Sequence, residues 1–355
     1  MADETRLRND TLRAAVVGAA GYAGIELVRL LAAHPRFRVT LVTSAKDAGR
    51  AVSDLYPALA SVDLVFVEPD VDEIVANADV AFLAVPHTAA MAIAPALLDA
   101  GLTVIDASAD FRLKDAEVYR AWYGVEHVAP NLLAQAVYGL PELHRAQLPG
   151  ATLVACPGCY PTASLLASLP AIEAGLTKGA RVIVDAKSGV SGAGRTPNEG
   201  THFVAVDEAV APYKVTQHRH TPEIARELAL VIGNDVSLVF TPHLVPMNRG
   251  LLATVYLDAA DSISAEDVHA AYRARYDSEP FITLHPLGRM PSTGEVRGSN
   301  RAHLGVALDE RAGVIVVACA IDNLVKGTSG QAVQCANLAL GFEETLGLMT
   351  PGPVV

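Results

Sequence analysis

Short apolar runs alternate with amphipathic segments through the first half of the chain. Strands are predicted near residues 13–17, 39–43, 80–85 and 103–106. Helical periodicity follows the first strand as far as His34 and returns from Thr88 to Ala100. Apolar strands alternating with helices are typical of a parallel sheet covered on both faces. The first half therefore predicts an α/β domain.

The second half has strand-like runs in series, at residues 181–185, 236–240, 251–257, 303–308 and 314–321, with one helical stretch at 265–276. This pattern favours a second α+β domain with a mixed or antiparallel sheet. We expect a polar tail at 1–12, a first domain at 13–159 and a second at 160–324. A C-terminal helix within 325–347 is expected to pack back on the first domain.

The amino-acid composition and net charge indicate which general class of protein this chain belongs to. The 355 residues are 51% hydrophobic with a formal net charge of -12, which fits two domains with proper cores and argues against nucleic-acid binding. No apolar run reaches the ~20 residues of a membrane span, and the charged start has no signal-peptide pattern. Four cysteines without such a signal indicate reduced thiols and a cytoplasmic protein.

A glycine turn follows the first strand, with Gly18, Gly21 and Gly24 in a G-x-x-G-x-x-G spacing. Between a strand and a helix, such glycines let the backbone approach a pyrophosphate, which makes the first domain Rossmann-like. Ordinary turn glycines are the alternative. Ser44 and Lys46 follow the next strand without an acidic residue, which favours NADP(H) over NAD, unless Lys46 is a solvated surface lysine.

Cys159 lies between Pro157-Gly158 and an apolar periodic segment, and so at the predicted start of a helix. The unpaired N–H groups and the dipole of a helix start favour a thiolate, which is the nucleophilic form of cysteine. Cys156 and Cys159 also form a C-x-x-C pair, which leaves a redox pair or half of a metal site as alternatives. A buried, inert cysteine is a third. We expect no metal.

Three further segments carry candidate chemistry. His218 and His220 precede a helix predicted near Pro222, and in an extended stretch both would face one pocket as proton carriers. Arg112, in the run that begins at Ser108, has the forked group that suits a carboxylate or phosphate, or forms a surface salt bridge. Residues 187–195 read as a glycine-rich loop that contacts a cofactor or is merely flexible.

Assembled in order, these motifs resemble the N-acetyl-γ-glutamyl-phosphate reductase family of the aspartate-semialdehyde dehydrogenase-like superfamily. The resemblance runs from about Arg13 to Leu346 and is most specific in Pro-Gly-Cys-Tyr-Pro-Thr at 157–162 and His-Arg-His-Thr-Pro-Glu at 218–223. Its other landmarks are residues 18–24, 108–112, 138–142, 187–194, 242–246 and 323–331. Cys156 departs from the polar residue expected there and places a second thiol near the nucleophile.

The resemblance implies NADPH-dependent reduction of an acyl phosphate through a thioester on Cys159, with His220 as acid and base. It implies substrate contacts from His218, Arg112, Tyr213 and Ser108. It implies cofactor contacts from Gly18, Gly21, Tyr22, Ala23, Gly24, Ser44, Lys46 and Pro86, and from Ser188, Gly189 and Asn323 of the second domain. Phosphate is released, and a homo-oligomer, dimer or tetramer, is expected.

Three other functions remain open at this point. The same machinery would serve the aminoadipyl or aspartyl phosphate, because pocket shape sets substrate length. A non-catalytic NADP-binding sensor would keep the glycine turn without a reactive thiol. A thiol–disulfide exchanger would need Cys156 as well as Cys159.

Overall fold

The computed structural model describes residues 11–353, and the chain divides into two compact units. The first unit contains the residues up to Cys156 together with Ser329–Met349, and the second contains Pro157–Thr328 and the residues from Thr350 onward. Residues 1–10 of the predicted polar tail lie outside the described residues. Between residues 11 and 353, no helix is both long and apolar enough to cross a bilayer.

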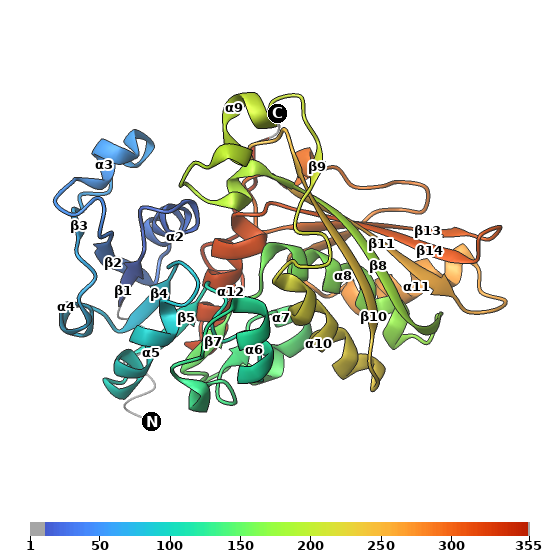
Figure 1. The fold of residues 1–355 in the computed structure, drawn as a ribbon, viewed down its shortest axis with the longest axis horizontal. Helices are drawn as coiled ribbons and strands as arrows, with labels where there is room; N and C mark the ends of the chain where they lie inside the picture. Colours follow the sequence, from blue (N-terminus) through green and yellow to red (C-terminus); the bar gives the residue numbers. More distant parts are fainter. Residues whose placement is uncertain (1–10, 354–355) are drawn as a thin grey trace. The chain divides into compact units, whose positions relative to one another are not determined.

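The first unit is built on a seven-stranded sheet in the order β3-β2-β1-β4-β5-β7-β6 (Figure 1). The strands pair in parallel, which confirms the predicted Rossmann-like sheet. They are β1 (Leu12–Val17), β2 (Phe37–Thr43), β3 (Phe66–Val67), β4 (Val80–Leu83), β5 (Thr103–Asp106), β6 (Val137–Tyr138) and β7 (Leu153–Ala155). The strand order reverses between β1 and β4, the position at which open α/β sheets bind ligands.

The helices of the first unit are α2 (Tyr22–Ala32), α3 (Val52–Leu55), α4 (Val71–Asn77), α5 (Ala90–Asp99), α6 (Ala116–Tyr123), α7 (Pro141–His144) and α12 (Gly330–Ala339). Although α12 comes late in the chain, it packs against α2 and β5. Gln331 Nε2 fastens it by donating to the carbonyl of Gly139 at 2.7 Å. The helical pattern predicted to continue to Leu346 ends at Ala339, because Gly341 adopts a φ of +73°, which stops helix propagation.

The second unit has a mixed seven-stranded sheet in the order β12-β13-β14-β11-β8-β10-β9. Its strands are β8 (Thr177–Gly189), β9 (Ala211–Pro212), β10 (Ser237–Val245), β11 (Leu251–Ala259), β12 (Ile282–Leu284), β13 (Ala302–Asp309) and β14 (Val314–Ile321). The pairs β10·β8 and β12·β13 are parallel and the others antiparallel, so the predicted mixed sheet is confirmed.

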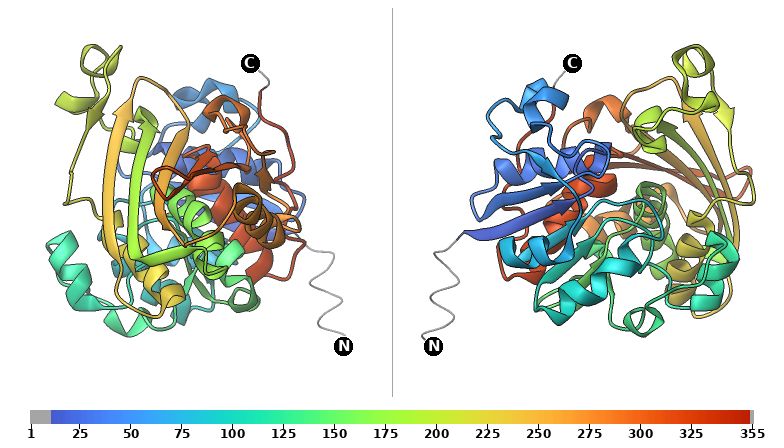
Figure 2. Two further views of the ribbon diagram at one scale, coloured as in Figure 1. Left: turned by 90° about the vertical axis from the view of Figure 1, so that its right-hand side faces the viewer. Right: turned by 60° about the vertical axis from the view of Figure 1, so that its left-hand side comes forward.

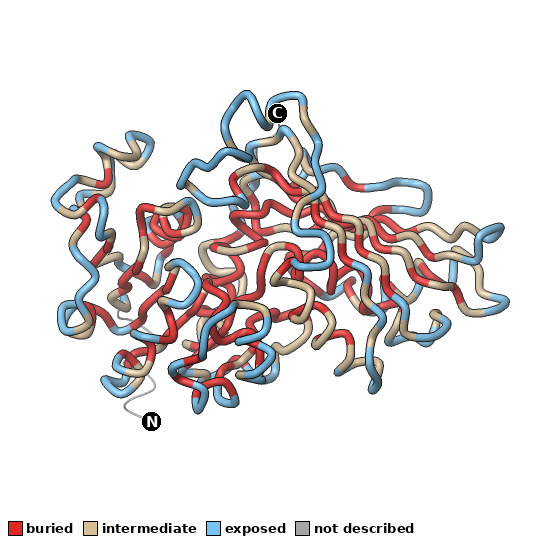
Figure 3. Tube along the Cα trace, viewed as in Figure 1, coloured by how far each residue is buried: buried red, intermediate tan, exposed pale blue. Residues whose placement is uncertain are grey.

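One face of this second sheet is covered by helices α8 (Cys159–Glu173), α10 (His220–Ile232) and α11 (Ala265–Tyr276), while the short helix α9 (Phe203–Val206) precedes β9 (Figure 2). Residues 160–171 of α8 are all buried, which makes α8 the central helix of the unit. Along β11, buried residues alternate with half-buried ones (Figure 3). The sheet therefore has one face in the core and one less covered face.

Candidate active site

Cys159 is the first residue of α8, as the sequence predicted. The N-cap, Gly158, has an extended backbone and no side-chain cap. Since Pro161 has no N–H, the first turn offers the N–H groups of Cys159 and Tyr160 to an anion. Cys159 is half-buried, whereas the other three cysteines are buried. This position gives one accessible thiol a helix start that stabilises its thiolate.

Gly327 packs directly on Cys159. A Cβ at this position would lie 2.7 Å from Cys159 Cβ, closer than real Cβ atoms approach, and 3.2 Å from its Cα, which is a tight contact. The Gly327 N–H donates to the carbonyl of Asp322 at 2.9 Å, which holds the segment in place. A glycine is therefore needed at 327 to leave room for the thiol.

Glu223 connects the two most specific sequence motifs. It lies in the first turn of α10, is 1% exposed, and accepts a hydrogen bond from the Gly158 N–H through Oε1 at 3.0 Å. Helices α8 and α10 also pack on each other. The bond therefore ties the start of the helix that carries Cys159 to the start of the helix that carries His220.

His218 and His220 face each other, although not by the predicted extended geometry. Helix α10 already begins at His220, and Arg219 is helical (φ -62°, ψ -17°), so the extended interpretation is wrong. The two rings nevertheless lie 4.7 Å apart, because the turn folds His218 back to accept the His220 N–H on Nδ1 at 3.2 Å. With Nδ1 an acceptor, a neutral His218 carries its proton on Nε2.

Aromatic side chains enclose the two histidines. The ring centroid of Tyr160 lies 5.5 Å from that of His218 and 6.0 Å from that of His220. The ring centroids of Tyr213 and Phe240 lie 5.4 Å and 5.3 Å from that of His218. Tyr213 donates to the Tyr160 hydroxyl at 3.2 Å, and Tyr160 donates to the carbonyl of His243 at 3.1 Å. Burial, followed by the neighbouring phenol and Cys159, raises the pKa of Tyr160 far above its usual value.

The pKa of Tyr213 is also raised, first by burial and then by the charge of Cys159, against a lowering contribution from Tyr160. Both phenols are therefore protonated at neutral pH and act as hydrogen-bond donors. Because Tyr213 hydrogen-bonds Tyr160, the residue after Cys159, it belongs to the surroundings of Cys159. The second unit thus brings together four predicted site residues: Cys159, His220, His218 and Tyr213.

Ser188, Gly189 and Asn323 form a second group within this unit. The predicted loop at 187–195 is strand up to Gly189, which ends β8, and continues as a 3-10 helix at Val190–Ala193. Asn323 is 1% exposed, accepts the Gly250 N–H on Oδ1 at 2.8 Å, and donates from Nδ2 to Ser191 Oγ at 3.0 Å. Its amide therefore positions the backbone around Ser188 and Gly189.

In the first unit, the glycine turn connects β1 to α2. Gly18 has a φ of +83°, and a Cβ there would lie 2.5 Å from the carbonyl oxygen of Ala84. A Cβ on Gly24 would lie 2.3 Å from the carbonyl oxygen of Gly18, so this glycine allows close packing of helix on strand. Gly21 is the N-cap of α2 without a side-chain cap, so the helix N–H groups suit a phosphate.

Tyr22 and Ala23 are the first two residues of α2, next to these N–H groups. Pro86 follows β4, the neighbour of β1 across the switch point. Thr88, in the same loop, has a strained φ of +77° and donates its N–H to Asp110 Oδ1 at 2.8 Å. Asp110 is fully buried and also accepts the Met91 N–H, at 3.1 Å. Asp110 therefore fixes the loop that carries Pro86.

The tip of β2 differs from the sequence expectation. Ser44 donates to Asp47 Oδ2 at 3.2 Å, and Arg50 pairs with the other oxygen of this buried carboxylate at 3.1 Å. Lys46 is exposed beside them. An acidic residue therefore does stand at this tip, three positions beyond Ser44, with its charge balanced by Arg50.

Ser108 and Arg112 follow β5 and are both buried. Arg112 donates from Nε to the carbonyl of Cys156 at 2.7 Å and from Nη2 to the carbonyl of Ala107 at 3.1 Å, so it is not the surface salt bridge considered as an alternative. Ser108 Oγ accepts the Asp110 N–H at 3.3 Å. Arg112 thus holds the end of the chain segment that leads into Pro157-Gly158-Cys159.

Sequence reasoning did not single out Glu223, Gly327, Asp110 and Asp47. Glu223 lies within the motif at 218–223, but its hydrogen-bond partner, Gly158, is 65 residues away in the chain, so the sequence does not indicate the contact. Gly327 and Asp110 likewise act through contacts formed only on folding. Asp47 had a sequence signal, because an acid shortly after the second strand is the residue that a dinucleotide site would use.

Family models match both units of the chain. The "Semialdehyde dehydrogenase, NAD binding domain" matches residues 13–151, and the "Semialdehyde dehydrogenase, dimerisation domain" matches residues 159–323. Among curated relatives, proteins from Magnetococcus marinus and Azotobacter vinelandii are 48% and 49% identical over 95% of this chain, and cover 97% and 98% of their own lengths. Both are called N-acetyl-gamma-glutamyl-phosphate reductase.

Solved structures share the fold at low sequence identity. Aspartate semialdehyde dehydrogenase II from Vibrio cholerae aligns with a TM-score of 0.71 at 18% identity, over 93% of this chain and 98% of its own. The enzyme from Candida albicans, solved with NADP, aligns with a TM-score of 0.69 at 15% identity over the same shares. At these identities the likeness shows the fold.

Replacing Glu223 tests the tie between the two helices. We expect Glu223→Ala to lower kcat by about tenfold or more. The Gly158 N–H would lose its acceptor, which costs about 1–3 kcal/mol of folding free energy, and the two helix starts would no longer be held in position. Glu223→Gln keeps an acceptor and should recover most of kcat. Steady-state kinetics with thermal unfolding of both variants measure this; equal losses in Ala and Gln would contradict the positioning function.

Asp106 at the end of β5 predicts a pH dependence of stability. Burial, partly offset by Ser108, raises its pKa to about 7, and among residues 11–353 no group donates a hydrogen bond to its Oδ2. The folded state holds a proton that the unfolded state releases near pH 4, so this group makes the protein less stable as pH rises from about 4 to 7.

We expect Asp106→Asn, which keeps the acceptor for the Ser108 N–H, to flatten this dependence. Urea unfolding at pH 5 and pH 8 measures it: the wild type should lose more stability than the variant between the two values, and equal slopes would contradict the assignment.

Proposed function

The chain belongs to the N-acetyl-γ-glutamyl-phosphate reductase family, and we propose that it reduces N-acetyl-γ-glutamyl phosphate to N-acetylglutamate 5-semialdehyde through a thioester on Cys159. It is an NADPH-dependent oxidoreductase that releases phosphate and serves arginine biosynthesis. The observation that carries the proposal is the tie between two helix starts. Glu223 holds the helix of the nucleophile and the helix of the acid–base group in register.

The first unit has the features that a dinucleotide phosphate requires. The backbone at Gly18 and Gly24 leaves no room for side chains, and Gly21 begins α2 without a side-chain cap, so the helix start offers its N–H groups. Gly18, Gly21, Tyr22, Ala23 and Gly24 would hold the pyrophosphate, and Pro86 would line the switch point. NADPH, when bound, supplies the hydride.

Lys46 would bind the 2′-phosphate, since Lys46 is an exposed cation and the charge of Asp47 is balanced by Arg50. Ser44 would join it once its hydroxyl, which donates to Asp47, turns toward the phosphate. In the second unit, Ser188 and Gly189 would contact the cofactor directly. Asn323 would act at least by positioning, because its amide holds Gly250 and Ser191 through hydrogen bonds on both its oxygen and its nitrogen.

The first chemical step is attack by the Cys159 thiolate on the acyl carbon. The carbon–sulfur bond forms, the carbon–oxygen bond to phosphate breaks, and phosphate leaves with the bonding electrons. The Cys159 N–H at the start of α8 donates to the oxygen that gains charge. A negative charge develops where the helix dipole is positive, so the same helix start stabilises both thiolate and oxyanion.

His220 donates and accepts the proton in the second half of the reaction, in which the thioester is reduced. After reduction, the thiohemiacetal oxyanion on Cys159 takes a proton from His220. His220 then removes that proton as the carbon–sulfur bond breaks, so the aldehyde leaves and the thiolate is restored. His218 Nε2–H is a donor suited to the polar groups of the substrate, while Tyr213, whose hydroxyl donates to Tyr160, would accept a hydrogen bond from them. Ser108 and Arg112 would complete the substrate site.

A homo-oligomer is proposed from the less covered face of the second sheet. Val239, Ile183, Tyr256 and Val316 are cross-strand partners on β10, β8, β11 and β14, and form an apolar row opposite the helices. Val239 is 48% exposed, an unusual position for valine in mid-strand. A second copy is the expected partner, since the matching family model is described as a dimerisation domain.

A reducing compartment such as the cytoplasm suits the proposed chemistry, because Cys159 attacks only as a thiolate and none of the four cysteines, all within residues 11–353, forms a disulfide.

The function is tested in the reverse direction, by following NADP reduction with N-acetylglutamate 5-semialdehyde and phosphate. We expect phosphate-dependent turnover with this substrate and little with aspartate semialdehyde or the aminoadipate homologue. Cys159→Ser should lower turnover by about a thousandfold or more without weakening NADP binding, because the chemistry is covalent. Preference for another semialdehyde would overturn the substrate assignment, and an active serine variant would overturn the mechanism.

His220→Asn tests the acid–base assignment. We expect kcat to fall by about a hundredfold to ten-thousandfold, with the NADP dissociation constant unchanged and one limb of the pH–rate profile lost. His202→Asn is the matched control, because His202 is an exposed histidine of the same unit. An unaltered pH profile in the His220 variant would assign the proton transfer elsewhere.

Val239→Glu tests the oligomer. A charge in the apolar row should shift the protein toward monomer, because it would be buried without a partner at the interface. Leu230→Glu is the control, since Leu230 is equally apolar and 61% exposed on α10. Size-exclusion chromatography with light scattering measures both; an unchanged mass for Val239→Glu would exclude this face.

A further inference from the structure

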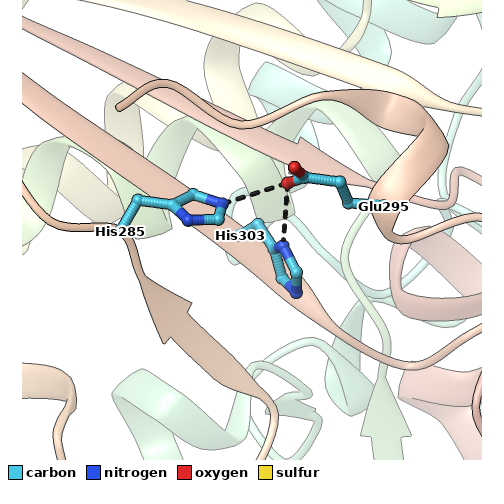
Figure 4. A group of neighbouring side chains, drawn as sticks. All are labelled: His285, Glu295 and His303. Carbon is cyan, nitrogen blue, oxygen red and sulfur yellow. Dashed lines mark hydrogen bonds and ion pairs between the residues drawn. The ribbon is translucent and has the colours of Figure 1, made fainter. Parts of the chain in front are cut away.

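Three metal-ligating side chains meet at the edge of the second sheet, in a segment that the proposed reaction does not use. His285 directly follows the edge strand β12, Glu295 ends a 3-10 helix at Thr293–Glu295, and His303 is the second residue of β13. Figure 4 shows the two imidazoles directed at one carboxylate. All three potential ligand atoms lie within 4.8 Å of one another.

The geometry is close to that of a metal-binding triad. His285 Nε2 lies 3.0 Å and His303 Nδ1 lies 3.2 Å from the same atom, Glu295 Oε2. With metal–ligand distances of about 2.0–2.2 Å, these separations correspond to angles of about 90° to 100° at an ion, between the octahedral and tetrahedral values. Both nitrogen–oxygen separations therefore suit two ligands of one ion, which would replace the two hydrogen bonds.

The surrounding contacts hold the ligands in this arrangement. The His285 backbone is fixed on both sides, because its N–H donates to the Leu304 carbonyl at 2.8 Å and its carbonyl hydrogen-bonds His269 Nε2 at 3.0 Å. Arg289 donates to Glu295 Oε1 at 2.8 Å and the Ser292 N–H donates to Oε2 at 3.4 Å, and these contacts orient Oε2 toward the imidazoles. Metal sites depend on such supporting contacts for ligand orientation.

We propose that His285, Glu295 and His303 bind one divalent transition-metal ion, of which Zn²⁺ is the best match. Two imidazoles and one carboxylate are a recurrent ligand set for Zn²⁺, with water in the remaining position. The side chain of His285 is 6% exposed, whereas those of His303 and Glu295 are 14% and 30% exposed, so an ion can enter from solvent. The bound ion would bridge β12, β13 and the 3-10 helix.

The experiment uses the full-length, untagged Cys159→Ala protein, which removes the one accessible thiol as a competing ligand. Zn²⁺ binding is measured by calorimetry, and Co²⁺ binding by its visible absorption. We expect one equivalent to bind. Glu295→Gln and, separately, His303→Gln should weaken binding by about tenfold or more, a scale on which even supporting residues act. His202→Gln, an exposed histidine outside the triad, should bind as the parent does.

X-ray absorption of the Zn²⁺-loaded parent protein gives a readout that needs no triad variant. A first coordination shell of the zinc with only nitrogen and oxygen atoms, two of them from imidazoles, would support the site even if a triad variant fails to fold. Sulfur in the shell, absence of stoichiometric binding, or equal affinity in folded triad variants and the His202 control would overturn the proposal and leave Glu295 as a plain ion-pair partner of two histidines.

Discussion

The hydrogen bond from the Gly158 N–H to Glu223 is the contact on which the catalytic group depends. It joins the N-cap of the central helix α8 to the first turn of α10. The two helix starts carry Cys159 and His220, so in the proposed mechanism the bond sets the relation between the nucleophile and the acid–base group. Because the acceptor is buried, water does not compete for the bond, and the geometry is fixed before substrate arrives.

Close packing around these helix starts explains why small residues and glycines recur at functional positions. Gly327 leaves space for the Cys159 side chain, while Gly18 and Gly24 bring α2 against the sheet of the first unit. In both units, the backbone must approach where a Cβ would collide. A glycine N-cap also leaves the N–H groups of the helix start without a side-chain acceptor. These N–H groups suit a thiolate in the second unit and a phosphate in the first.

Buried polar residues do much of the positioning. Asp110 holds the strained Thr88 loop, Asn323 joins Gly250 to Ser191, and Arg112 holds the carbonyl of Cys156. None of these side chains needs to touch a reacting atom to matter, because losing one leaves buried partners without hydrogen bonds. A family resemblance that assigns contacts to Arg112 and Asn323 therefore describes only part of what they do here.

The sequence by itself determined the parallel and mixed sheets, the helix start at Cys159 and the glycine turn. These features depend on local periodicity, helix caps and steric requirements, which involve residues that are neighbours in the chain. It did not reveal that His218 and His220 meet through a helical turn, that Glu223 ties two motifs, or that His285, Glu295 and His303 converge. Those relations join residues on different elements. Only the packing of the folded chain sets the distances between such side chains, so the tertiary structure alone decided them.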